Sequence, residues 1–78
     1  MDTIAQKTIE YFFKKNEVNS QELKVKVLPQ ITDLVYEYNM AVVNYEGQSD
    51  VYRQAQIKKD IGYIEDKINH LLQEISSK

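Results

Sequence analysis

Hydrophobic residues recur every three to four positions along most of the chain, which is the period of an amphipathic α-helix. Between Thr3 and Lys15 the inward side of such a helix holds Ile4, Ala5, Thr8, Ile9 and Phe12, with Phe13 at its margin. The pattern predicts a first helix at about residues 3–15 and a loop over residues 16–20. Ser20 is a favourable N-cap residue for a second helix.

The segment 23–28 has two possible interpretations. Leu23, Val25 and Val27 alternate with Lys24 and Lys26, which is the pattern of a strand. An isolated strand is not stable, and no second strand is available to pair with it. We therefore expect one or two helical turns here, although an extended conformation stays open. Pro29 either kinks the helix or begins a new one as its first residue.

The next predicted helix, at about residues 30–46, has two apolar faces. The main face holds Ile31, Leu34, Val35, Tyr38, Ala41, Val42 and Tyr45. Tyr36, Met40 and Val43 form a second stripe on the opposite side. A helix that is apolar on two opposed faces is expected to lie between neighbours. Gly47 is expected to end this helix as its C′ residue.

A heptad pattern marks the last predicted helix, at about residues 50–76, which Ser49 or Asp50 can cap. Its core seam is Ile57, Ile61, Ile64, Ile68, Leu71 and Ile75, spaced alternately four and three residues apart. The short link 47–49 predicts an antiparallel, coiled-coil-like hairpin with the preceding helix, and the first helix packs across it. The sequence thus predicts an all-α, small three-helix bundle forming a single domain over residues 1–78. A chain of 78 residues buries little core, so we expect a homo-oligomer of unspecified number.

Composition narrows the environment and the partners. There are no cysteines, the N-terminus lacks the features of a signal peptide, and no apolar run is long enough to span a bilayer, so a cytoplasmic protein without a membrane partner is expected. Ten basic and twelve acidic residues give a net charge of −2. Nucleic acid is an unlikely partner at this charge, because its binding sites require a basic excess.

Few residues have the chemistry of a catalytic or metal site. His70 is the single histidine and falls outside the heptad seam, where we expect an ordinary surface residue. The chain has no Glu-x-x-His motif and no Gly-rich phosphate loop. We therefore expect no catalytic residue, metal or cofactor, and the chain is not interpreted as an enzyme.

Candidate contact residues come from the exposed aromatic, apolar and small positions. The candidate interface is Tyr36, Met40, Val43, Tyr52, Gly62 and Tyr63. Gly62 belongs to a row of short side chains with Ala55, Asn69 and Ser76, which either receives another backbone or is an ordinary surface. A possible anion contact is formed by Lys14, Lys15, Lys24 and Lys26, with a solvated loop as the alternative interpretation.

No motif is specific enough to indicate a family. The leading hypothesis is a small non-enzymatic interaction or regulatory protein that self-associates through helix faces and binds a partner protein. Phage- and plasmid-type inhibitors and adaptors share this general format, which is an analogy of format only. The alternative is an oligomeric protein that binds or sequesters a small anionic, nucleotide-like ligand in inter-subunit pockets lined by tyrosine and lysine.

Overall fold

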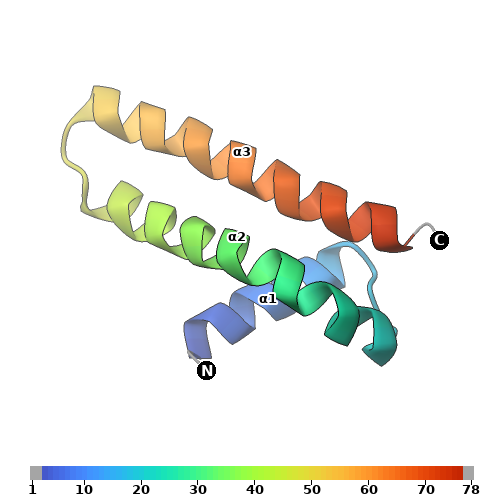
Figure 1. Cartoon of the computed structure of the whole chain (residues 1–78). Coiled ribbons are helices and arrows are strands. Elements are labelled where there is room, and N and C mark those ends of the chain that lie inside the picture. The colour runs from blue at the N-terminus through green and yellow to red at the C-terminus, as the bar shows by residue number, and fades with distance from the viewer. Residues whose placement is uncertain (1–2, 77–78) are drawn as a thin grey trace.

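Over residues 3–76 the chain forms three α-helices joined by two short loops (Figure 1). This computed structural model describes residues 3–76, with side chains from Ala5 onward, so the predicted inward position of Ile4 lies outside the described side chains. Helix α1 is Thr3–Lys15, α2 is Gln21–Gly47 and α3 is Val51–Ser76. The predicted all-α fold is confirmed, and the described residues contain no strand.

Helix α1 ends in a compact reversal of the backbone. Glu17 adopts a left-handed conformation with φ of 56°. The Val18 N–H donates to the Phe13 carbonyl over 2.8 Å, and the Glu17 N–H donates to the Lys14 carbonyl over 3.2 Å. This is the hydrogen-bond pattern of a Schellman motif, and Val18 is buried beside α1 as its hydrophobic contact.

Helix α2 is longer than the sequence predicted. Ser20 caps it as expected, because its hydroxyl accepts a hydrogen bond from the Leu23 N–H. The helix then continues through Pro29 without a break, so the prediction that this element begins at about residue 30 was wrong. Residues 23–28 are helical. The buried Val27, Ile31 and Val35 follow one another at four-residue intervals across the proline, and their packing holds the helix together there.

The reversal between α2 and α3 uses polar caps instead of a left-handed glycine. The expectation for Gly47 as a C′ residue was wrong: Gly47 is the last residue of α2 and has no positive φ. The Gln48 N–H donates to the Tyr45 carbonyl, which ends α2. Asp50 then caps α3, since its carboxylate accepts hydrogen bonds from the N–H groups of Tyr52 and Arg53. The resulting hairpin is antiparallel, as predicted.

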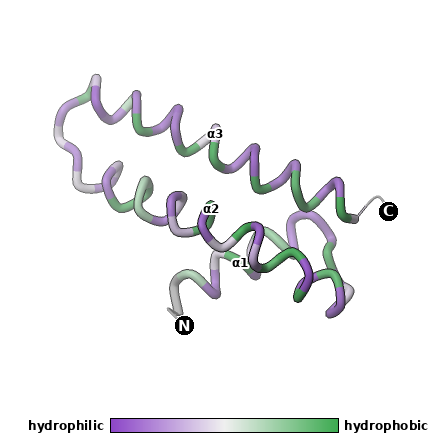
Figure 2. Tube along the Cα trace, in the orientation of Figure 1, coloured by the Kyte–Doolittle hydropathy of each residue, from purple (hydrophilic) through white to green (hydrophobic). Residues whose placement is uncertain are grey.

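The hydrophobic core lies at one end of the hairpin. Its buried side chains are Ala5, Ile9, Phe12, Phe13, Val18, Val27, Ile31, Val35, Ile68 and Leu72. In Figure 2 the apolar segments recur along α3 at regular intervals, as a heptad seam requires. Of that seam Ile68 is fully buried; Ile64, Leu71 and Ile75 are partly buried against the core, and Ile57 and Ile61 are half-buried.

Helix α1 packs against the half of the hairpin that is remote from the turn at residues 48–50 (Figure 1). Three contacts fix it there: the Thr8 hydroxyl donates to Asn39, the Phe12 ring meets Tyr38 edge-on, and Lys15 pairs with Glu65. Because α1 has 13 residues and α3 has 26, the half of the hairpin next to the turn has no third helix beside it. The molecule is accordingly elongated, with dimensions of 43 × 25 × 17 Å.

Candidate protein-interaction surface

The second apolar stripe of α2 lies on the surface. Tyr36, Met40 and Val43, which we call the outer stripe, are 46%, 66% and 67% exposed. Met40 follows the buried Ile31 by nine residues, or two and a half helical turns, so it points away from the core. The inner face of α2 is packed, as expected. The outer stripe is covered by neither α1 nor α3, so α2 does not lie between two neighbours within the chain.

Two exposed acidic residues border the outer stripe. Asp33 and Glu37 precede Tyr36 and Met40 by three residues each, which places them beside these side chains on the helix surface. The chain has no lysine or arginine between Lys26 and Arg53. Within the described residues the ion pairs are Lys15–Glu65 and His70–Glu74, and neither involves α2. The outer stripe is thus an apolar line with an uncompensated acidic edge.

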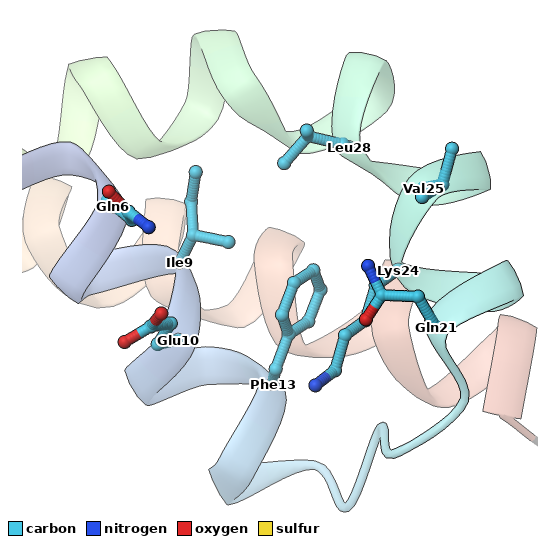
Figure 3. Close-up of a pocket in the computed structure, with 8 residues that line it drawn as sticks. All are labelled: Gln6, Ile9, Glu10, Phe13, Gln21, Lys24, Val25 and Leu28. Carbon is cyan, nitrogen blue, oxygen red and sulfur yellow. The ribbon is translucent and has the colours of Figure 1, made fainter. Parts of the chain in front are cut away.

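The same line of α2 extends toward its N-terminus, which the sequence interpretation missed. Val25 precedes Tyr36 by eleven residues, just over three full turns, and is 62% exposed. Val25 also lines a pocket of about 300 Å³ between α1 and α2. Figure 3 shows Ile9 and Phe13 of α1 and Leu28 of α2 pointing into this space, with Lys24 beside the Phe13 ring. The spacing of eleven residues was the available signal, and the strand-like alternation around Val25 concealed it.

The candidate residues of α3 do not join the outer stripe. Tyr52 and Tyr63 are 89% and 62% exposed and lie three turns apart on a different helix. The Lys67 ammonium lies 4.4 Å from the centre of the Tyr63 ring, a cation–π contact. Gly62 is exposed, and a Cβ atom built there would meet nothing within 4 Å. Within the row of short side chains, Asn69 accepts a hydrogen bond from Asn16 of the loop after α1.

Two of the four candidate anion-binding lysines are engaged within the chain. The Lys15 ammonium lies 3.2 Å from a Glu65 carboxylate oxygen, and the pKa of Lys15 is raised because Glu65 accepts its hydrogen bond and attracts its charge. Lys24 lies over the Phe13 ring, 5.7 Å from its centre. Lys14 and Lys26 are exposed.

Two titratable side chains, His70 and Tyr38, have different surroundings. His70 is exposed, and its Nε2 lies 3.9 Å from a carboxylate oxygen of Glu74 one turn away. Tyr38 is half-buried among the three helices, and burial raises its pKa, with the Glu65 charge acting in the same direction. No group of three histidine, cysteine, aspartate or glutamate residues in the described part of the chain is arranged to hold a metal ion.

Comparisons with known proteins identify no similar protein. The chain matches no protein-family model, no curated protein and no solved structure. None of the three described helices is both long and apolar enough to cross a bilayer. The surface itself is therefore the basis for a functional proposal.

Proposed function

We propose that this chain is a non-enzymatic interaction protein that binds a partner protein through the outer stripe of α2. The observation that carries the proposal is the exposure of Tyr36, Met40 and Val43 on one line of a helix whose other face is packed. Side chains at i, i+4 and i+7 are the anchor spacing by which helices dock into apolar grooves or pair with other helices. Binding without chemistry is how adaptors and protein inhibitors act.

The acidic edge indicates the chemistry of the partner. Asp33 and Glu37 are one turn apart with like charge, an arrangement that mildly destabilises an isolated helix. Lysine or arginine side chains on a partner would relieve this repulsion and align the two surfaces. We therefore expect a partner helix or groove that is apolar at its centre and basic at its border.

Met40→Lys tests the proposal because Met40 is exposed and contributes little to the core. We expect this variant to stay folded, with a free energy of unfolding within about 0.5 kcal/mol of the wild type. Affinity capture from the source cells, quantified by mass spectrometry, should recover a protein with the wild type and lose it with Met40→Lys. The purified pair should then show at least about tenfold weaker binding by calorimetry, because the centre of an interface tolerates charge poorly.

Tyr52→Lys is the matched control, since it introduces the same charge at an exposed ring on α3. It should bind the partner as the wild type does. Equal capture by wild type and Met40→Lys, or the failure of every captured protein to bind the purified chain, contradicts the proposal.

A further inference from the structure

The outer stripe is the C-terminal part of a longer uncharged line along α2. The six residues of this line, which we call the long stripe, are Val25, Pro29, Thr32, Tyr36, Met40 and Val43. Steps of three or four residues keep them within about 80° of the helix circumference. Thr32 is half-buried and the other five are exposed. The long stripe therefore runs for about 27 Å, or about five helical turns.

The long stripe fits a helix better than an extended segment. The Thr32 hydroxyl already donates to the Leu28 carbonyl over 2.6 Å, so the side chains offer little hydrogen bonding beyond the Tyr36 hydroxyl. An extended peptide must find partners for its own N–H and C=O groups, whereas a helix pairs these groups internally. Apolar residues at steps of three and four are also the contact that two packed helices share.

Charges along one border of the long stripe distinguish its two ends. Lys26, Asp33 and Glu37 are exposed, and each precedes a stripe residue by three positions, so all three lie on the same border. Lys26 lies at the end near Val25, and the two carboxylates follow it by about two and three turns. A complementary helix therefore has an acidic residue at the Val25 end and basic residues beyond it.

The Val25 end of the long stripe adjoins the pocket between α1 and α2. Val25 is one of the lining residues, and Ile9, Phe13 and Leu28 point into the space (Figure 3). Its volume of about 300 Å³ is at the lower end of the range for small-molecule sites, which is enough for one large apolar side chain. Such pockets receive the anchor residues that dominate an interface. A side chain held there would fix the position of a docked helix along α2.

From these features we propose that the partner contributes one amphipathic α-helix of about five turns, which packs along the long stripe and inserts an apolar side chain into the pocket between α1 and α2. The acidic end of this helix lies beside Lys26, and its basic residues face Asp33 and Glu37. This inference rests on the proposed function, and it extends the contact from the outer stripe to the N-terminal half of α2 and to α1.

A synthetic helix of defined chemistry tests the docking site. The matched peptide has about 18 residues, with leucines at steps of three and four, glutamates near one end and lysines along the rest of both borders. The acidic peptide is identical except that glutamates replace the lysines. Calorimetry should show that the acidic peptide binds at least about tenfold more weakly, because its glutamates face Asp33 and Glu37 in whichever direction the helix lies. Circular dichroism should show that the matched peptide gains helix on binding.

Variants of the chain locate the site. Val25→Lys and Met40→Lys place a charge in the two halves of the long stripe, and each should weaken binding of the matched peptide at least about tenfold. Val51→Lys is the matched control, since it makes the same change at a valine of α3 that is 74% exposed, and it should bind as the wild type does. Glu37→Lys should narrow the difference between the two peptides. Thermal melting checks that each variant is folded.

Several results would overturn the inference. These are no binding of the matched peptide at millimolar concentration, binding without a gain of helix, equal weakening in Val51→Lys, and no weakening in Val25→Lys. Self-association of the wild type that Val25→Lys abolishes also overturns it, because a second copy would then occupy the long stripe. Peptide binding by a chain that captures no cellular protein contradicts the proposed function alone. A captured protein that is lost with Met40→Lys but bound equally by Val25→Lys contradicts this inference alone.

Discussion

Tyr38 lies at the junction of all three helices. Its ring packs edge-on against Phe12 of α1, with 5.4 Å between the ring centres, and Glu65 of α3 is close enough to influence its titration. Burial raises the pKa of Tyr38, and Glu65 and Tyr11 add to the effect while Lys15 opposes it. The folded protein thus keeps the Tyr38 proton to a higher pH than the unfolded chain does.

Stability should therefore fall as the pH rises above the ordinary tyrosine pKa of 10.0. The contribution of Tyr38 is fully present below that pH and is lost as the pH passes through the raised pKa of the folded state. Lys15 acts in the same direction, since its own pKa is raised by Glu65. Thermal melts between pH 8 and 11 should show a falling melting temperature, and Tyr38→Phe should reduce the slope. An identical slope in Tyr38→Phe would contradict the assigned role of this residue.

Individual residues were predicted less well than the elements that contain them. The heptad seam included Leu71, but Leu72 is the residue that is completely enclosed. A heptad pattern describes a seam between two helices, whereas here α1 and its loop cover α3 from a second direction and draw Leu72 inward. Val18 was missed for a related reason: the left-handed Glu17 that turns it toward the core has none of the usual sequence signals of glycine or asparagine.

Helix α2 contains a proline as its ninth residue. Pro29 has no N–H to donate to the Val25 carbonyl, and its ring crowds that carbonyl. The helix persists because Ser20 caps its start and because Val27 and Ile31 are buried on either side of the proline.

Replacing this proline should stabilise the protein. Pro29 is exposed, so Pro29→Ala removes little packing and restores one backbone hydrogen bond. We expect the free energy of unfolding in urea to rise by about 2 kcal/mol, after allowing for the greater freedom of the unfolded chain. Gln30→Ala, at the next exposed position, is the control and should change stability by less than about 0.5 kcal/mol. No gain in Pro29→Ala would mean that packing requires the proline geometry.

The ambiguity of residues 23–28 had a physical origin. The alternation of Leu23, Val25 and Val27 with lysines is compatible with a strand. Only contacts with residues distant in the sequence determine whether this segment is helical or extended. Val27 is enclosed by the core while Val25 is 62% exposed, a difference that a strand with both on one face would not give. Helical geometry separates the two valines by more than half a turn.

At the scale of the whole molecule, the core is confined to one end. The amides near Ile31, Val35, Ile68 and Leu72 should exchange with solvent only through global unfolding. The amides of residues 40–62, where no side chain is buried, should exchange faster through local opening of the half of the hairpin next to the turn. Hydrogen exchange followed by mass spectrometry or NMR would measure this gradient, and uniform protection along both long helices would contradict it.

The residues of the candidate surface could be predicted from the sequence, but whether another helix of the chain covers them could not. The stripe of Tyr36, Met40 and Val43 follows from helical spacing alone. Whether α1 covers this stripe depends on where α1 crosses the hairpin. Two contacts fix the crossing, Thr8 with Asn39 and Lys15 with Glu65, and their partners are 31 and 50 residues apart in the sequence. No local pattern encodes contacts at that range.

The one-sided core also constrains the order in which the chain can fold. A helical hairpin would normally be expected to zip up from its turn, where loop closure is least costly. Here the residues beside the turn at 48–50 gain almost no apolar burial on pairing, and the first fully enclosed pair, Val35 and Ile68, is separated by the whole of residues 36–67. The rate-limiting step must therefore close this long loop and dock α1 at the far end, while the turn and its neighbours are still loosely joined. Substitutions near the turn would then change the unfolding rate and leave the folding rate nearly untouched, whereas substitutions at Phe12 or Ile68 would slow folding itself.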